Sequence, residues 1–517
     1  MDPVLASRRR LLWQAAAMAG AALTPAAWTS AVAQPRLADD PFQVGIASGE
    51  PLPDGVVLWT RLVTNPQAMD SGMTRAPVKV GWEIAEDDKL TKTVRRGEAL
   101  AVAEAGHSVH IEVSGLKPNR DYWYRFNAGG HASGVGRTRT APERGAKVDK
   151  LRIAYGSCQK WESGYYSAHA DLAEQNPDLV LFLGDYIYEK KASKDGVVRF
   201  HPPVDAQDLA SYRQRYAWYK ADPDLQAAHA CAPWMIMWDD HEVSNDYGGD
   251  QDRSNPAVAQ FLKRRAAAYQ AYYENMPLRR TVKPVGPNMR LYRTLDWGRL
   301  ARLAVIDDRQ YRAHRSCDAQ QNEANEKLIP AACPERFDPK RSMLGAPQEA
   351  WLQGQLRDTQ ARWNLLGQQT LMNEIITPDL RVSNDGWDGY DQTRRRILEG
   401  WRDAKTSNPV VLGGDVHCFF AGDLSLEKGG KPIASEFVGG SISSLGRTKE
   451  VIRGMMGITP ALKFGDGATR GYGRVDITEK DCTVTFRGVQ DALVPKSPVS
   501  DLAKFVVEDG EAGLKRV

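Results

Sequence analysis

Five short apolar runs along the chain each stop at side chains that can bind metal or move protons. The run Leu179 to Leu183 ends at Gly184, and Asp185, Tyr188 and Glu189 follow it. A run of five apolar residues bounded by glycine is typical of a buried central strand. Open α/β sheets place their chemistry just beyond the carboxyl ends of such strands. We therefore expect Asp185 and Tyr188 at the rim of a cleft.

The other four runs repeat this pattern with thiol, carboxylate, amide and imidazole groups. Leu151 to Gln159 ends in Ser157 and Cys158, Trp234 to Asp246 in Asp239, Asp240, His241, Glu242 and Asn245, Arg302 to Asp308 in two aspartates, and Val410 to His417 in Asp415 and His417. Capping and packing do not require these residue types at five strand ends. The pattern predicts that the five ends form one site.

Helical patterns lie between these runs. They cover Ser167 to Gln175, Pro256 to Asn275, Gln348 to Trp363 and Asp391 to Lys405. Strands that alternate with helices predict a layered α/β domain. The polar stretches Lys190 to Val204 and Asp307 to Ser342 are expected as long loops near the cleft mouth.

The chain before Pro142 has a different pattern, with short alternating runs such as VKVGWEIA and YWYRF between turn signals. This pattern predicts a small β-sandwich. Gly115 to Pro118, followed by Tyr122, Tyr124 and Phe126, resembles the fibronectin type III pattern. We predict a fibronectin type III-like domain at 34–142, a catalytic domain at 143–495 and a C-terminal tail at 496–517.

The first 33 residues have the order of an export signal. Arg8, Arg9 and Arg10 precede an apolar stretch, and Ala31-Val32-Ala33 follows as a small-residue cleavage site. Paired arginines followed by two leucines indicate the twin-arginine export machinery as a partner and a periplasmic or secreted location. An uncleaved anchor is disfavoured because Thr24 and Pro25 interrupt an apolar stretch that is short for a bilayer.

Composition narrows the function further. The 517 residues suggest more than one domain, and a formal net charge of +3 gives no support for nucleic-acid binding or for general attraction to anionic membranes. Of six cysteines, Cys317 and Cys333 bracket a polar segment and fit a disulfide. Cys231, Cys418 and Cys482 are most simply buried small hydrophobes.

The motifs GDxxY at Gly184 to Tyr188, DDHE at Asp239 to Glu242 and GDxH at Gly414 to His417 occur in the order of a known family. From about Phe42 to about Val489 the chain resembles the alkaline phosphatase D family, a branch of the purple-acid-phosphatase-like and calcineurin-like metallophosphoesterases. The resemblance implies an α/β sandwich of two packed sheets flanked by helices. It also implies hydrolysis of phosphomonoesters or phosphodiesters by a metal-activated water.

The resemblance assigns roles within the site. Asp185 would bridge two metals, and Cys158, Tyr188 and His417 would complete a set suited to Fe³⁺. Asp240 and Asp415, with either Asn245 or backbone oxygens, would form an oxygen-rich set for one or two Ca²⁺ or another hard divalent ion. Related enzymes read GNHE where this chain reads DDHE, so Asp240 adds a negative charge. His241 would protonate the leaving group or bind phosphate.

Other interpretations remain open at this point. Arg213 or Arg215 is a candidate phosphate clamp, but an arginine-rich helix surface explains the SYRQRY stretch equally well. The same site could serve a phospholipase D-like or teichoic-acid-like phosphodiesterase, or a hydrolase of another ester. An exported polymer-binding protein with a degenerate hydrolase fold would predict missing ligands, whereas every motif here is filled.

Overall fold

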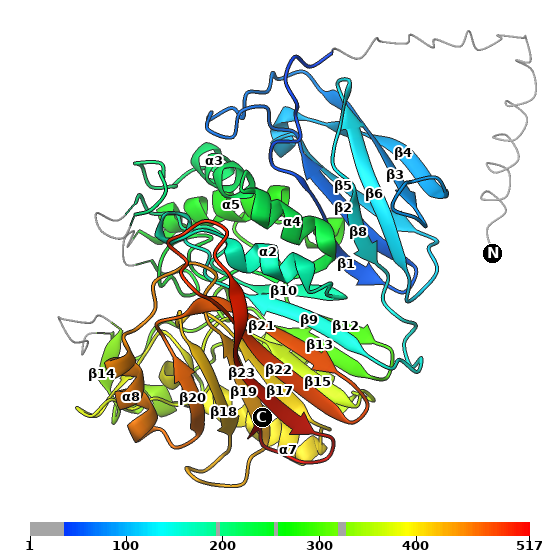
Figure 1. Cartoon of the computed structure of the whole chain (residues 1–517). Helices are drawn as coiled ribbons and strands as arrows, with labels where there is room; N and C mark the ends of the chain where they lie inside the picture. Colours follow the sequence, from blue (N-terminus) through cyan, green and yellow to red (C-terminus); the bar gives the residue numbers. More distant parts are fainter. Residues whose placement is uncertain (1–35, 193–196, 253–256, 319–326) are drawn as a thin grey trace, which may run out of the picture. The chain divides into compact units, whose positions relative to one another are not determined.

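The computed structural model describes residues 36–192, 197–252, 257–318 and 327–517 (Figure 1). The chain divides into two compact units, Met1–Pro35 and Arg36–Val517, and only the second is described below. The export signal predicted at residues 1–33 lies outside the described residues. Among the helices that are described, none combines the length and the apolar character needed to cross a bilayer.

Two large sheets form the centre of the unit. The first has the order β24 (Lys515–Arg516), β23 (Val499–Glu508), β22 (Asp481–Val489), β21 (Arg470–Ile477), β9 (Leu151–Gly156), β10 (Leu179–Leu183), β11 (Pro233–Met237), β1 (Ile46–Leu52), β2 (Gly55–Arg61) and β5 (Ser108–Ser114). The second has the order β12 (Arg293–Trp297), β13 (Ala301–Val305), β15 (Trp363–Gly367), β17 (Pro409–Gly413), β19 (Ala434–Gly439), β18 (Phe419–Leu424) and β20 (Leu462–Asp466).

Each large sheet has a parallel, fully buried centre. Strands β9, β10 and β11 pair in parallel, as do β13, β15, β17 and β19. Every residue of β10, β11, β13, β15, β17 and β19 is buried. Strands buried on both faces are near-continuous apolar runs rather than alternating ones, which explains the sequence pattern. The five predicted strands are β9, β10, β11, β13 and β17.

The two sheets share one hydrophobic cluster. The Tyr155 hydroxyl of the first sheet donates to the Phe437 carbonyl of the second at 3.2 Å. The Phe437 ring lies 5.8 Å from Phe505 and 6.4 Å from Phe486 between centroids. A mixed α/β fold with several sheets is therefore confirmed.

The helices are α2 (Ser167–Glu174), α3 (Leu209–Lys220), α4 (Pro223–Cys231), α5 (Val258–Asn275), α6 (Gly345–Arg357), α7 (Asp391–Ala404) and α8 (Lys449–Ile458). Four of them were predicted, but the helix expected to reach Trp363 ends at Arg357. Trp363 instead opens β15, where it pairs with Ala301 and its indole donates to the Thr478 carbonyl at 2.7 Å. A helix at the SYRQRY stretch, which lies in α3, was one of two alternatives, whereas α4 and α8 were not predicted.

The N-terminal strands are divided between two sheets, although residues 42–128 form one hydrophobic cluster. The domain boundary at residue 142 stays a prediction. Strands β3 (Val78–Ala85), β4 (Thr93–Ala101), β6 (Asp121–Ala128), β7 (His131–Ala132) and β8 (Gly136–Arg139) form a smaller sheet. However, β1, β2 and β5 belong to the ten-stranded sheet, because Gly49 of β1 pairs with Trp234 of β11. A Cβ at Gly49 would lie 2.7 Å from the Trp234 carbonyl oxygen, so this contact requires glycine. The fibronectin type III likeness stays a prediction.

The C-terminal tail predicted at 496–517 is wrong, because these residues contain β23 and β24. Strand β23 pairs along its length with β22 (Figure 1). Phe505 of β23 is fully buried and packs against Phe437, Phe464 and Phe486. These residues complete the core of the ten-stranded sheet.

Phe505→Ala should lower the free energy of unfolding by about 3 to 5 kcal/mol, because it removes a buried ring and leaves a cavity. Lys504→Ala, at the exposed neighbouring position of the same strand, is the matched control and should change it by less than about 0.5 kcal/mol. Urea denaturation followed by circular dichroism measures both. Equal effects of the two substitutions would contradict the placement of β23 in the core.

Candidate active site

The carboxyl ends of five parallel strands deliver the predicted residues to one region. Cys158 follows β9, Asp185 follows β10, Asp240 follows β11, Asp308 follows β13, and Asp415 with His417 follows β17. A further contribution comes from the loop after β19, whose Ser444 was not predicted as a site residue. Its hydroxyl donates to the Cys158 carbonyl at 2.8 Å and lies 2.8 Å from the Tyr188 hydroxyl.

Four of these residues adopt the left-handed backbone conformation. The φ angles are 60° at Cys158, 55° at Asp185, 59° at Asp415 and 55° at His417. For residues with a Cβ this conformation costs about 1 to 2 kcal/mol each, and such residues cluster at functional sites. The sharp turn directly after each strand directs these side chains toward one another.

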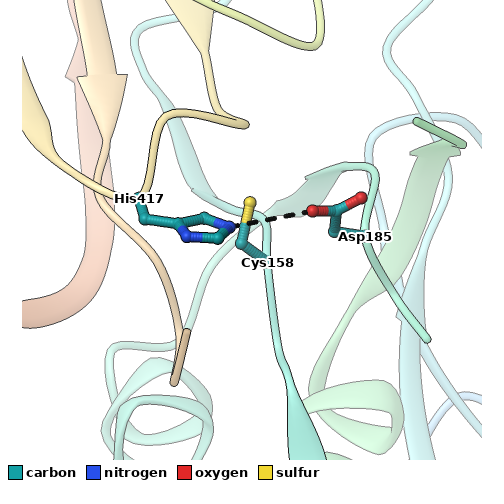
Figure 2. Close-up of side chains that lie close together, drawn as sticks. All are labelled: Cys158, Asp185 and His417. Carbon is teal, nitrogen blue, oxygen red and sulfur yellow. Dashed lines mark ion pairs between the residues drawn. The ribbon is translucent and has the colours of Figure 1, made fainter. Parts of the chain in front are cut away.

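The first group of candidate ligands comprises Cys158, Asp185 and His417 (Figure 2), whose donor atoms lie within 4.8 Å of one another. His417 Nε2 is 3.9 Å from Asp185 Oδ2. The Tyr188 hydroxyl donates to Asp185 Oδ2 at 2.8 Å and lies 3.1 Å from His417 Nε2. The structure therefore brings together all four residues of the set predicted for the first metal.

In the protein alone, Cys158 of this group and the adjoining Tyr188 favour their protonated forms. Burial raises the pKa of the Cys158 thiol well above its ordinary value, and the charge of Asp185 raises it further. The same two causes raise the pKa of the Tyr188 hydroxyl. Thiolate and phenolate ligation at neutral pH therefore requires a cation that displaces both protons.

Two further groups adjoin the first. Asp185, Asp240 and His241 form one, and Asp239, Asp240 and Asp415 form the other, each with donor atoms within 4.8 Å. Asp239 was not among the predicted ligands, although it precedes Asp240 in the motif. The backbone N–H of Asn245 donates to Glu189 Oε1 at 2.9 Å. A ligand role of the Asn245 side chain stays a prediction.

Several carboxylate oxygens in this region have no hydrogen-bond partner among the described residues. They are Asp185 Oδ1, Asp239 Oδ2 and both oxygens of Asp308, all fully buried. An unsatisfied buried acceptor costs about 1 to 3 kcal/mol, and more when it is charged. Free carboxylate oxygens beside a thiol, a phenol and an imidazole fit cation binding.

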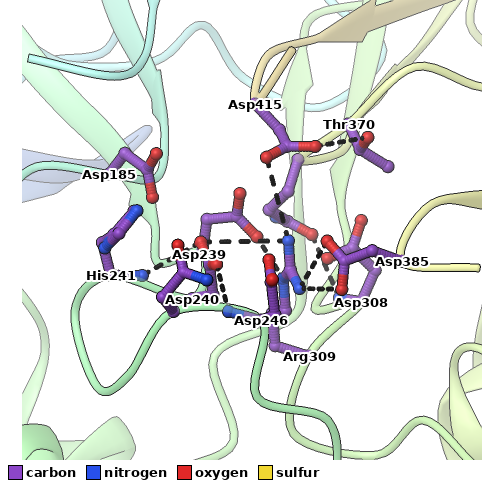
Figure 3. A network of polar contacts seen from close by, with 12 residues as sticks. Asp185, Asp239, Asp240, His241, Asp246, Asp308, Arg309, Thr370, Asp385 and Asp415 are labelled. Carbon is purple, nitrogen blue, oxygen red and sulfur yellow. Dashed lines mark hydrogen bonds and ion pairs between the residues drawn. The ribbon is translucent and has the colours of Figure 1, made fainter. Parts of the chain in front are cut away.

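A network of basic side chains offsets part of the negative charge (Figure 3). Arg309 is fully buried and donates from Nη1 to Asp385 at 2.9 Å and from Nε to Asp239. Arg312 and Lys327 also pair with Asp385. Sequence reasoning missed Arg309, although its position directly after Asp307 and Asp308 at a strand end was a usable signal.

His241 lies beside the first group, and its charge is set by its neighbours. Its Nδ1 atom is 2.6 Å from Glu189 Oε2, and its ring centroid is 4.1 Å from that of Tyr188. Burial alone lowers the pKa of His241, but the charges of Glu189, Asp240 and Asp185 together raise it to about 10. In the protein alone, these carboxylates therefore favour the protonated, cationic form of His241 at neutral pH.

Glu242 joins the loops after β10 and β11. Its buried carboxylate accepts backbone N–H groups from Asp185 at 3.1 Å, Tyr186 at 2.5 Å and Asp239 at 2.8 Å. Burial and the nearby Asp185 raise its pKa to about 8. The last residue of the DDHE motif thus fixes the backbone that carries two candidate ligands.

The guanidinium groups of both predicted phosphate-binding arginines are engaged by other protein groups, so a phosphate-binding role stays a prediction. Both guanidinium groups are engaged elsewhere: Arg213 makes a bidentate pair with Glu274 at 2.6 Å, and Arg215 donates to the carbonyls of Tyr188, Lys190 and Val204. Arg215 is 2% exposed and supports the loop behind Tyr188. Both arginines lie on α3 and act in its packing.

The cysteines outside the site largely match the predictions made from the sequence. Cys317 and Cys333 form a disulfide. Cys418 and Cys482 are buried free thiols, and Cys231 is half-buried. His110 of β5 lies outside the site and contacts the carbonyls of Tyr273 and Met276 at 3.0 Å.

A layered α/β fold that gathers thiol, phenol, imidazole and carboxylate donors at its strand ends defines a hydrolase of the phosphoesterase class. The chain belongs to the PhoD-like phosphatase family: the family model matches residues 153–486, and the model of the family's N-terminal domain matches residues 27–142.

A comparison of sequences and a comparison of structures both support this assignment over most of the chain. Alkaline phosphatase D of Bacillus subtilis (strain 168) is 40% identical over 502 residues, which cover 94% of this chain and 84% of that protein. A solved structure described as PhoD superposes with a TM-score of 0.88, at 40% identity and with 93% of each chain covered. The protein is a phosphoric ester hydrolase, and the non-enzymatic polymer-binding hypothesis loses its support.

Arg213→Ala should destabilise the protein by roughly 1 to 3 kcal/mol, because it leaves Glu274 buried without its cation. It should leave kcat/KM for a phosphate ester unchanged, because Glu274 engages the guanidinium group of Arg213. Arg96→Ala, at an exposed position of β4, is the control for stability. Thermal melts and steady-state kinetics measure the two effects. A tenfold rise in KM without a change in Tm would instead indicate that Arg213 binds phosphate.

Proposed function

We propose that the protein is an exported, metal-dependent phosphoesterase that hydrolyses phosphomonoesters, phosphodiesters or both. One observation carries the proposal: Cys158, Asp185 and His417 place their donor atoms within 4.8 Å, and Asp240 and Asp415 adjoin them. Export by the twin-arginine route rests on residues 1–33 alone.

The donor chemistry supports two kinds of metal. Cys158, Tyr188 and His417 with Asp185 are an electron-rich set that suits Fe³⁺. Asp240 and Asp415, with Asn245 or the newly placed Asp239, are hard oxygen donors that suit Ca²⁺. Metals bound there would make water a nucleophile near neutral pH and polarise the phosphoryl oxygens. The carboxylate of Asp185 joins the first group to the second, as Asp240 joins the second to the third, so Asp185 is the bridge between the iron-type ligands and the oxygen-rich ligands.

Among the described residues of the site, His241 is best placed to donate a proton to the leaving group. Glu189 engages its Nδ1 and keeps the ring charged, which leaves Nε2 to donate. A protonated imidazole can bind a phosphoryl oxygen or transfer its proton to the departing alkoxide. The substrate stays open, and a panel of monoester, nucleotide, phospholipid and polymer diester substrates would separate the phosphatase from the phosphodiesterase alternatives.

Asp185→Asn and His241→Ala should separate metal binding from proton transfer. Loss of the shared Asp185 carboxylate should deplete bound metal and activity together, whereas loss of His241 should lower kcat by about a hundredfold with metal retained. Metal analysis and hydrolysis of p-nitrophenyl phosphate and its bis-ester measure both. Asp388→Asn, a buried aspartate outside the site, is the control. Full metal content and rate in Asp185→Asn would contradict the bridge.

The visible absorption spectrum of the purified protein tests the identity of the first metal. Phenolate and thiolate ligands of Fe³⁺ give visible charge-transfer absorption, which Zn²⁺ and Ca²⁺ cannot give. Tyr188→Phe should shift or remove the band with little effect on folding, whereas Tyr155→Phe, at a buried tyrosine outside the group, should leave it unchanged. Cys158→Ser should weaken iron retention. A colourless, iron-free and fully active enzyme would refute the iron assignment but not the phosphoesterase.

A further inference from the structure

Arg309 contacts or approaches carboxylates from three separate loops. Its Nε donates to Asp239 after β11, and its Nη1 donates to both oxygens of Asp385 at 2.9 and 3.2 Å. The remaining nitrogen, Nη2, lies 3.9 Å from Asp240 Oδ1 and 4.0 Å from Asp415 Oδ1. Figure 3 shows the guanidinium among these carboxylates.

The orientation of this guanidinium is fixed. The backbone N–H of Arg309 donates to Asp307 Oδ1 at 2.9 Å. Asp385 is held from the other side by Arg312, which donates from Nη1 to the Asp385 carbonyl at 2.8 Å. Asp239 and Asp385 thus clamp two edges of a planar group, and the direction of Nη2 follows from that plane.

The two carboxylates that Nη2 approaches are each held at their far oxygen. Asp240 Oδ2 accepts the Asp246 N–H at 2.5 Å, and Asp415 Oδ2 accepts the Thr370 hydroxyl at 2.8 Å. Their Oδ1 atoms both face Nη2, which is buried and has no hydrogen-bond partner among the described residues. Asp240 Oδ1 also accepts the His241 backbone N–H at 3.0 Å. Nη2 thus approaches two mutually repelling oxygens without donating a hydrogen bond to either.

We propose that Arg309 is a positioning residue that holds Asp240 and Asp415 ready to bind a hard divalent cation. The inference rests on the proposed function, since it assigns these two aspartates to the second metal. Arg309 touches neither metal nor substrate in this role. It acts through the orientation of the ligands, as hydrogen-bonded partners of metal ligands do.

A simpler role would be charge neutralisation, and the two roles predict opposite signs. If Arg309 only offsets negative charge, its removal adds one net negative charge and a cation should bind more tightly. If it positions the ligands, its removal should weaken binding although the charge becomes more favourable. Lysine keeps the charge but lacks the planar fork, so it separates charge from geometry.

The experiment measures Ca²⁺ binding by titration calorimetry to the chelator-treated protein. Arg309→Lys should raise the Kd about tenfold or more, the size of effect typical for partners of metal ligands. Arg309→Met should also raise it, against the electrostatic trend. The control is Arg394→Lys, a buried arginine bonded to Asp388 and Asp391 outside the cluster, which should bind as wild type does. Tm values show whether a change reflects folding alone.

The outcomes separate this inference from the proposed function. If wild type takes up no Ca²⁺, the proposed second metal position fails, and the role of Arg309 fails with it. If wild type binds and Arg309→Lys binds equally well, only the role of Arg309 is wrong. Tighter binding by Arg309→Met would also overturn it. If Arg309→Met does not fold, Arg309→Lys decides, because it leaves no buried carboxylate without a cation.

Discussion

Mutual repulsion among buried carboxylates is the constraint on which the rest of the site depends. Asp185, Asp239, Asp240, Asp308 and Asp415 follow parallel strands, and Asp385 reaches them from the loop after residues 381–383. All of them except Asp415 are buried, and the six outnumber the Arg309, Arg312 and Lys327 cations near them. Isolated charges in a low-dielectric interior are expensive, so such a cluster persists only with compensating charge. The arginine network supplies part of this compensation, and the remaining negative charge would favour the binding of a cation.

The same constraint explains why the backbone around the site is so closely tied. Candidate ligands sit in left-handed turns directly after strands, and the Glu242 carboxylate gathers three N–H groups from two loops. Gly184 lets these loops meet, since a Cβ there would lie 2.3 Å from the Asp239 Cβ. The turns, the Glu242 hydrogen bonds and the close contact at Gly184 each restrict backbone movements that would let the carboxylates move apart. Rigid placement before the ligand arrives favours tight binding.

The sequence was most informative where local pattern and chemistry coincide. Apolar runs that end in Asp, Cys or His revealed the strand ends, because parallel strands buried on both faces need no alternation. It failed where partners are distant in the chain: Arg309 bonds Asp385, 76 residues away, and Arg213 meets Glu274 across 61 residues. The alternation in Val499 to Glu508 does fit a half-buried strand, but nothing local indicates that β22 is its partner. The predicted helix was carried on to Trp363 because this residue continues the apolar stripe, whereas the observed helix α6 ends at Arg357.

The order of strands in the large sheet has a consequence for how the chain is made. Strand β9 begins at residue 151, yet one of its two neighbours is β21, which starts at Arg470 and leads into the last strands of the chain. Until the ribosome has released these residues, β9 has an unpaired edge, and exposed edges invite pairing with other chains. Pairings over such sequence separations also form slowly. From the synthesis of β9 to that of β21, the nascent protein therefore carries a strand edge whose partner has not yet been made.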